Sequence, residues 1–226
     1  MTAKLVPLRR ISGDITEMSD EALLAACGTG DAPALGALFD RFHVAVYRFA
    51  ARLAMTDELA RDDLVQATFL EVQRAAPSFR GTSSVKTWIL GVAANIARHT
   101  LRAERRRRAH QARFLERVAA APELLDAQLE RRKLLARIAE ALADLPRDQQ
   151  IAFILCDLEQ LPGVEVARVL DVPDGTLWRR LHTARKAMRQ AIEKATQEAT
   201  RAANQEVTKT AAEKAAEKTA EEKVRR

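Results

Sequence analysis

The sequence predicts an all-α protein made of two small helical domains joined by a linker. Ala, Leu and Arg dominate its 226 residues, and aromatic residues make up only 4%. These abundant residues lose little side-chain freedom in a helix. Long stretches carry apolar residues at steps of three and four, which is the spacing of one helix face. An interruption over 109–126 separates two groups of such stretches, and the second group contains a helix-turn-helix pattern.

The first domain is expected over 19–108, after a flexible arm of residues 1–18. Ser and Asp residues stand where its helices should begin, and their side chains accept hydrogen bonds from unpaired backbone N–H groups. Pro77 and a polar loop interrupt the pattern once. The expected caps and helices are Ser19 for 20–27, Asp31 for 33–53, Thr56 or Asp57 for 57–75, and Ser83 or Ser84 for 85–108.

The second domain is expected over 127–192, with its last two helices joined by the turn Asp171 to Gly175. The tail over 193–226 is rich in Ala, Glu and Lys and has almost no larger apolar residue. Because it has nothing to bury, it should be a solvated single helix or a disordered tail. The helices expected in the second domain cover 129–142, 147–161, 163–170 and about 176–192.

Charge is spread unevenly along the chain, whose formal net charge is +6. The stretch 98–117 holds eight arginines against two acids, and 175–189 holds five basic residues and no acid. By contrast, 57–71 carries five acids and one arginine. Two basic stretches and an acidic one indicate two kinds of partner, although each run taken alone also fits a solvated helix face.

Several function classes find no support in the sequence. Cys27 and Cys156 are isolated, and the four histidines have no metal-ligand spacing. No glycine loop for phosphate is present. We therefore expect no catalytic residue, no metal and no cofactor, and an enzyme acting on nucleic acid is the weakest of three hypotheses. Without an apolar run long enough for a membrane span or a signal peptide, we expect no membrane insertion and a cytoplasmic location.

The stretch 161–192 carries the clearest functional pattern, because its last helix has an apolar back and a basic front. Arginine pairs with guanine, and threonine contacts a thymine methyl group or a phosphate. The pattern predicts a helix that enters a DNA groove, and a plain amphipathic surface helix is the alternative. The predicted DNA-contacting residues are Thr176, Trp178, Arg179, Arg180, His182, Thr183, Arg185 and Lys186.

The polar loop 79–84 and the helix after it combine small polar residues with cations and a tryptophan. Single-stranded DNA needs cations for its backbone and a surface on which bases stack. Trp88 fits that surface, but a lone tryptophan on a helix also fits the core. The helix over 57–75 leaves a similar choice open, because its apolar residues spread over a broad arc among acids. That arc either contacts a partner protein or lies buried in the core.

Two long segments resemble one protein family. DDLVQATFLEVQRAAPSFRGTSSVKTWILGVAANIARHTLR resembles the second conserved region of bacterial sigma factors of the extracytoplasmic-function (ECF) group. LPRDQQIAFILCDLEQLPGVEVARVLDVPDGTLWRRLHTARKAM is similar to their fourth region. Together these segments cover about 19–192. The resemblance implies promoter recognition by a dissociable subunit of RNA polymerase, with core RNA polymerase and promoter DNA as partners. Family members are often held by an anti-sigma protein, which is a further expected partner.

The resemblance also implies roles for individual residues. The helix that begins the first segment would dock on core polymerase through Asp63, Leu64, Val65, Gln66 and Phe69. The helix-turn-helix would read the −35 element. Trp178 and Arg179 stand where many relatives carry Lys and Ser, so this chain's own base preference is expected there. The residues that would engage and open the −10 element are Arg80, Ser83, Lys86, Thr87, Trp88, Asn95, Arg98 and Arg102.

One rival hypothesis has a different functional class. An ordinary helix-turn-helix regulator would bind duplex DNA without joining polymerase. It accounts for the stretch 161–192, but it gives no role to the acidic and basic helices that precede the linker.

Overall fold

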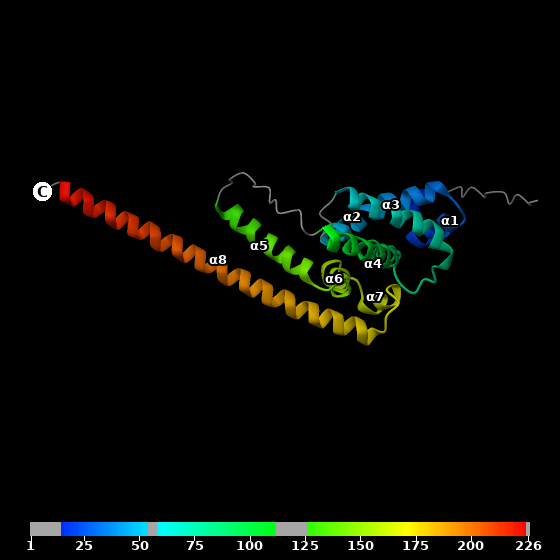
Figure 1. Cartoon of the computed structure of the whole chain (residues 1–226). Coiled ribbons are helices and arrows are strands. Elements are labelled where there is room, and N and C mark those ends of the chain that lie inside the picture. Colours follow the sequence, from blue (N-terminus) through cyan, green and yellow to red (C-terminus); the bar gives the residue numbers. More distant parts are fainter. Residues whose placement is uncertain (1–14, 54–57, 112–125, 225–226) are drawn as a thin grey trace, which may run out of the picture. The chain divides into compact units, whose positions relative to one another are not determined.

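A computed structural model describes residues 15–53, 58–111 and 126–224, and the side chains discussed below lie within 15–99 and 135–200 (Figure 1). No strand occurs in these ranges, which confirms the all-α class. The helices are α1 (Asp20–Gly28), α2 (Ala32–Arg52), α3 (Glu58–Ala75), α4 (Val85–Gln111), α5 (Asp126–Asp144), α6 (Arg147–Phe153), α7 (Gly163–Val169) and α8 (Asp174–Val224). Short turns lie at Ile15–Glu17 and Ala76–Ser78, and a π-helical turn follows α6 at Ile154–Leu158.

The chain forms two compact units. One comprises Met1–Val118 and Leu145–Arg185, and the other comprises Ala119–Asp144 and Lys186–Arg226. The first unit therefore joins α1 to α4 with α6, α7 and the first turns of α8. The second unit joins α5 with the rest of α8.

The caps of the first helices are where the sequence predicts them. The Ser19 hydroxyl accepts from the Ala22 N–H at 3.2 Å, and the Asp31 carboxylate accepts from the Ala34 N–H at 3.0 Å. Ser84, the second of two candidates, caps α4. The expected caps Thr56 and Asp57 lie outside the described residues.

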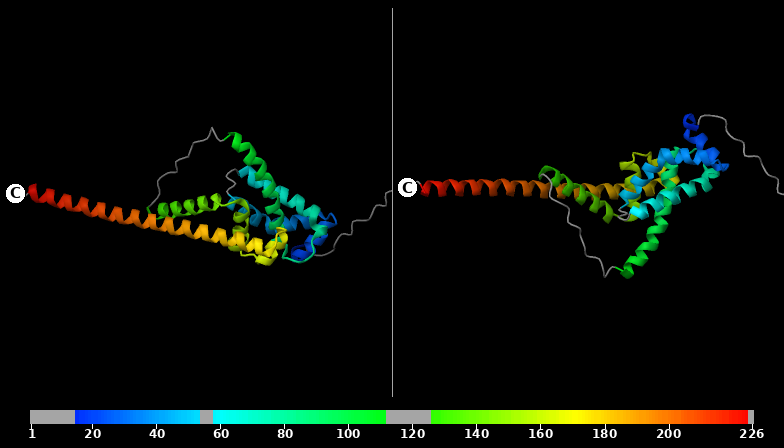
Figure 2. Two further views of the ribbon diagram at one scale, coloured as in Figure 1. Left: turned by 60° about the horizontal axis from the view of Figure 1, so that its bottom comes forward. Right: turned by 90° about the horizontal axis from the view of Figure 1, so that it is seen from above.

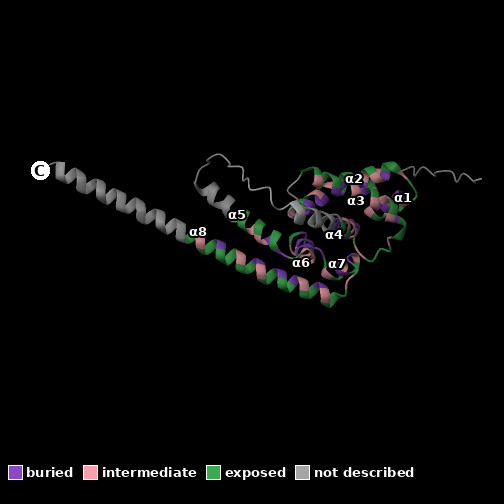
Figure 3. Cartoon of the chain, viewed as in Figure 1, coloured by how far each residue is buried: buried purple, intermediate pink, exposed green. Residues whose placement is uncertain are grey.

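The apolar stripes of α1 to α4 meet in a common core. Buried and exposed residues alternate along these helices as the helical period requires (Figure 3). Large side chains with less than 2% of their surface exposed fill this core. They are Leu23, Leu24, Leu38, Phe49, Leu53, Ile89 and Leu90.

The helix-turn-helix is formed by α7 and α8. Asp171 adopts a left-handed φ of 52° at the turn, and the Val172 N–H donates to the Ala167 carbonyl at 3.0 Å. The carbonyl of Pro173 accepts from the first free N–H groups of α8. Leu177 and Leu181 face inward with at most 1% of their surface exposed. The expected helix over 147–161 is shorter, because the π-helical turn ends it at Leu158.

The tail continues α8 without a break as far as Val224, which selects the helical alternative. Beside it, α5 runs along α8 in Figure 1 and in the left view of Figure 2, and an ion pair joins Arg137 to Glu198. Ala195 is only 4% exposed. The expectation that the tail buries nothing is therefore wrong for its first turns, because alanine leaves room for a neighbouring helix.

Candidate nucleic-acid and polymerase interfaces

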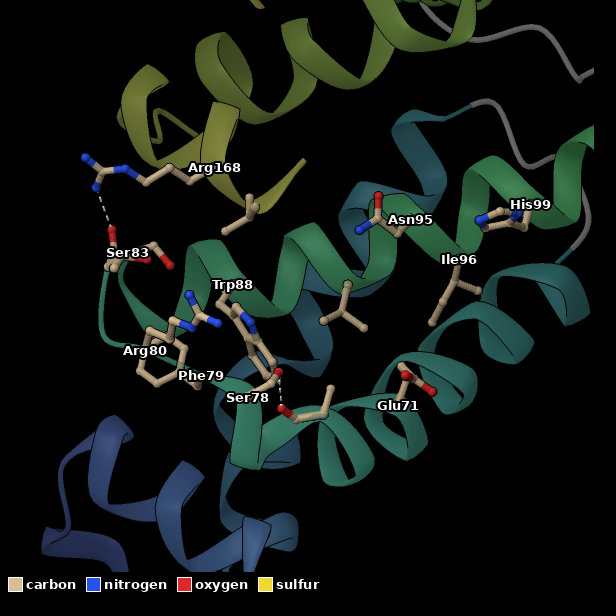
Figure 4. A pocket seen from close by; sticks show the side chains of 14 residues that line it. Glu71, Ser78, Phe79, Arg80, Ser83, Trp88, Asn95, Ile96, His99 and Arg168 are labelled. Atoms are coloured by element: carbon tan, nitrogen blue, oxygen red, sulfur yellow. Dashed lines mark hydrogen bonds between the residues drawn. The ribbon is translucent and has the colours of Figure 1, made fainter. Parts of the chain in front are cut away.

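A cavity of about 530 Å³, here called the α3–α4 cavity, lies where α3, the loop after it and α4 meet (Figure 4). The loop turns at Gly81, whose φ of 68° is left-handed and favours glycine. Four predicted residues line the cavity, namely Arg80, Ser83, Trp88 and Asn95. Lining residues that the sequence reasoning missed include Glu71, Phe79, His99 and Arg168.

One end of this cavity combines aromatic rings with a cation. Phe79 and Trp88 meet edge to face with ring centroids 5.6 Å apart, and Figure 4 shows Arg80 beside them, while His99 lies at the other end. Trp88 is half-buried. It thus packs against Phe79 and also borders the cavity, and its contact with DNA stays a prediction. Aromatic faces beside a cation suit an unpaired base and its phosphate.

Thr87 does not face this surface. It is fully buried, and its hydroxyl lies 2.8 Å from that of Ser84. The expectation that Thr87 contacts DNA directly conflicts with this burial, because its side chain completes the cap of α4 instead. The side chain of Arg102 lies outside the described residues.

Two other predicted DNA-binding cations of α4 are engaged in ion pairs. The ammonium of Lys86 lies 3.0 Å from the carboxylate of Glu159. The guanidinium of Arg98 lies 3.1 Å from the carboxylate of Asp148. Asp148 lies at the start of α6 and Glu159 follows the π-helical turn after α6, and both belong to the same compact unit as α4.

The predicted residues of α8 divide into an exposed set and a paired set. Arg185 binds Asp157 through two hydrogen bonds of 2.6 and 2.9 Å, which raise the pKa of its guanidinium. Arg180 pairs with Asp148 at 2.7 Å. Thr176 is half-buried, and the Thr183 hydroxyl donates to the Arg179 carbonyl. Exposed side chains on this helix include Trp178, Arg179, His182, Thr183 and Lys186.

The predicted polymerase-binding residues of α3 also divide. Three of them, Leu64, Val65 and Phe69, are at most 7% exposed and belong to the core, which conflicts with direct docking. Asp63 and Gln66 are exposed. With them lies an exposed face, part of the broad arc noted in the sequence, whose residues are spaced at three and four along the helix. This face, called the α3 face below, consists of Leu59, Asp62, Asp63, Gln66 and Leu70.

The described residues hold no cluster of three or more His, Cys, Asp and Glu side chains suited to a metal ion. Within the same ranges, no helix is both long and apolar enough to span a membrane. Burial and the neighbouring Asp157 raise the pKa of the Cys156 thiol to about 11, against the lowering effect of Arg185.

Comparison with known proteins accounts for both halves of the chain. Residues 38–107 match the family Sigma-70 region 2, and residues 135–188 match Sigma-70, region 4. The ECF RNA polymerase sigma-E factor of Escherichia coli (strain K12) is 31% identical over 183 residues, which cover 76% of this chain and 93% of that protein. The protein of the same name from Haemophilus influenzae is 28% identical over 178 residues, or 75% and 93% of the two chains.

Solved structures share the fold. The sigma factor RpoE bound to the anti-sigma factor NepR from Bartonella quintana has a TM-score of 0.53, at 24% identity over 69% of this chain and 94% of its own. CnrH, bound to the cytosolic domain of CnrY, has a TM-score of 0.55, at 25% identity over 77% and 97% of the two chains. The identity to the sigma-E factors over nearly their whole length shows that this chain belongs to the ECF group of RNA polymerase sigma factors.

Proposed function

We propose that the chain binds core RNA polymerase and directs it to promoters by reading a −35 and a −10 element and by opening the latter. The observation that carries this proposal is the presence of two different candidate DNA-binding surfaces in one chain. The α3–α4 cavity offers rings and a cation to unpaired DNA, and the exposed basic side of α8 suits a duplex groove. A stand-alone regulator needs only the second surface, so the cavity and the match to region 2 favour the sigma factor.

At the −10 element, the α3–α4 cavity would hold a base that has left the duplex. Arg80 would contact the backbone phosphate, and the half-buried rings of Phe79 and Trp88 would pack on the base. Asn95 is exposed at the same cavity and offers an amide to the base edge. Capturing unpaired bases offsets the few kcal/mol that unstacking costs. Opening then needs binding groups and no catalytic residue, as in the sigma factors generally.

At the −35 element, α8 would lie in the major groove. Arg179 and Lys186 are exposed and can reach base edges or phosphates. His182 and Trp178 share this side of the helix. Arg185 is held by Asp157 and keeps one guanidinium edge for a phosphate, because arginine carries five donors.

On polymerase, the α3 face would be the docking surface. Its exposed leucines, Leu59 and Leu70, are 72% and 62% exposed, and acids lie between them. Apolar contacts surrounded by polar groups are typical of interfaces that form and dissociate. We expect Asp62 and Asp63 to meet basic residues of the polymerase, because the charge of this face is negative.

A factor that joins polymerase on chromosomal promoters acts in the cytoplasm. Two solved structures with this fold are complexes, namely the sigma factor RpoE with the anti-sigma factor NepR, and CnrH with the cytosolic domain of CnrY. We therefore include an anti-sigma protein among the partners.

The test is reconstitution. The purified full chain is mixed with core RNA polymerase of the same organism, and transcription run-off on genomic fragments is followed by sequencing of the start sites. We expect co-purification with core and start sites that share two upstream elements. A chain that binds duplex DNA alone and fails to join core would overturn the proposal.

A further inference from the structure

Glu159 is a buried carboxylate between two cations of the first domain. Its side chain is 4% exposed, and it pairs with Arg52 at the end of α2 and with Lys86 at the start of α4. A buried carboxylate requires such partners, since a buried charge without a partner strongly destabilises the folded state. The position of Glu159 is thus fixed by α2 and by α4, of which α4 carries part of the proposed −10 surface.

Asp148, at the start of α6, makes the same kind of link. It forms an ion pair with Arg98 of α4 at 3.1 Å and another with Arg180 of α8 at 2.7 Å. One carboxylate therefore holds one cation from each of the two helices proposed to bind DNA. Phosphate oxygens offer the same kind of partner to arginine as a carboxylate does.

The polar loop beside the α3–α4 cavity is also held by α7. Arg168 donates to the Thr82 carbonyl at 2.9 Å, a contact drawn in Figure 4. The Ser84 N–H donates to the Glu165 carboxylate at 3.0 Å. Arg168 and Val169 themselves line the cavity, so α7 narrows the space that a flipped base would enter.

Gly91 allows α4 and α7 to come this close. A Cβ built at Gly91 would lie 2.6 Å from Cβ and 2.8 Å from Cγ2 of Val169. Real Cβ atoms essentially never approach other atoms within 3.0 Å. The packing of α7 on α4 therefore requires glycine at residue 91, although glycine weakens the interior of a helix.

From these contacts we propose that the segment 147–169, called the closing segment, blocks the proposed −10 surface of the same chain. This surface consists of the α3–α4 cavity and α4. In the free protein it covers α4 and the loop, and its acids Asp148 and Glu159 neutralise Arg98 and Lys86 in place of DNA phosphates. The closed chain must release this segment before it can bind a promoter. The effect of this closed conformation on DNA affinity rests on the proposed function, but the closed conformation itself does not.

The sharpest test is Gly91→Ala in the full chain, because it adds one methyl group at the α4–α7 contact and changes no charge. The matched control is Gly36→Ala in α2, where an added Cβ meets nothing within 4 Å. Small-angle X-ray scattering and hydrogen exchange are measured on both variants and on the wild type. We expect Gly91→Ala to increase the radius of gyration and to speed exchange at the Ser84 amide, with unchanged helicity by circular dichroism.

A second variant removes the buried charge. Glu159→Gln should also open the chain, and Glu193→Gln, an exposed acid on α8, provides the same charge change as a control. An unchanged radius and unchanged Ser84 exchange in both Gly91→Ala and Glu159→Gln would overturn the closure. A wild type that already exchanges Ser84 at the rate of an unprotected amide would overturn it as well.

DNA binding is measured separately by fluorescence anisotropy with a labelled single-stranded 30-mer of mixed sequence. Because Lys86 and Arg98 leave Glu159 and Asp148 when the chain opens, Gly91→Ala should bind this DNA at least about fivefold more tightly than the wild type. That factor lies in the range of typical coupling between two sites. Gly36→Ala should bind as the wild type does. If Gly91→Ala opens the chain and DNA affinity stays the same, the closure stands and the proposed DNA-binding role of α4 is overturned.

Discussion

The indole ring of Trp178 lies over Gly163, so that a Cβ built at residue 163 would be 2.9 Å from Cζ2 and 3.0 Å from Cη2 of the ring. The two residues belong to the two helices of the helix-turn-helix, and the ring is still 48% exposed. Trp178 therefore joins α7 to α8 with one edge and leaves the rest of its ring on the proposed DNA side. Because residue 163 is glycine, no side chain keeps the ring away from α7.

Gly163→Ala should push the ring of Trp178 away from α7. The atoms in conflict belong to the outer edge of a half-exposed side chain, so the ring moves more easily than the backbone. We expect a loss of about 1 kcal/mol in the free energy of unfolding, at the low end for an overpacked contact. Acrylamide quenching of Trp178, measured in a Trp88→Phe background, should increase. Gly36→Ala in the same background is the control, and equal quenching in both variants would contradict the contact.

Substitutions in α3 should separate folding from polymerase binding. Leu64 and Phe69 are each 4% exposed, and truncation of such residues to alanine typically costs about 2–5 kcal/mol. We expect Leu64→Ala and Phe69→Ala to lower the melting temperature strongly. Asp63→Ala and Gln66→Ala should keep the wild-type melting curve and weaken co-purification with core polymerase. Normal core binding by both exposed-site variants would remove the α3 face from the interface.

The contrast within α3 depends on the packing of neighbouring helices, which the sequence does not show. Caps such as Ser19 and Asp31 were predictable, because they depend on a side chain and a backbone N–H three residues apart. The apolar residues of α3 cover a broad arc, so the sequence alone left burial and partner binding equally open. Only the packing of neighbouring helices decides that Leu64 is inside and Leu70 is outside.

The proposed DNA-binding surfaces show the same limit. Cations and a tryptophan near a polar loop were predictable as a set, and four of the predicted residues do line one cavity. The burial of Thr87 was not predictable, because a threonine serves equally well in a cap or at a surface. The partners of Lys86 and Arg98 lie about fifty residues or more away along the chain, and no local pattern in the sequence connects them to Glu159 and Asp148.

Alanine variants of exposed basic residues test whether the basic side of α8 binds promoter DNA. Lys186→Ala should weaken promoter binding across sequences and lower the salt dependence, with a slope change of about one per lost phosphate contact. Arg179→Ala should in addition relax base preference at one position of the −35 element. Lys194→Ala, two turns further along α8 and also exposed, is the control. Loss of core binding in the Arg179 variant would mean that this side of α8 faces polymerase.

Cys156 should be almost inert to alkylation in the folded protein. Burial and Asp157 raise the pKa of its thiol from 9.0 to about 11, and only the thiolate reacts. At pH 8 the thiolate fraction is therefore about a hundredfold smaller than in the unfolded chain. The rate of iodoacetamide labelling of the Cys156 peptide, followed by mass spectrometry, should rise by a comparable factor in guanidinium chloride. Equal rates in the two states would show that the thiol is not desolvated.

The same shift predicts how stability depends on pH. Because the folded pKa of Cys156 is raised, the thiol stabilises the folded state fully below about pH 9. Between pH 9 and 11 the unfolded chain releases this proton and the folded chain keeps it, so the free energy of unfolding falls as pH rises. Cys156→Ser lacks a group that titrates in this window. Its melting temperature should therefore decline less steeply between pH 9 and 11 than that of the wild type, and parallel curves would assign the decline to other groups.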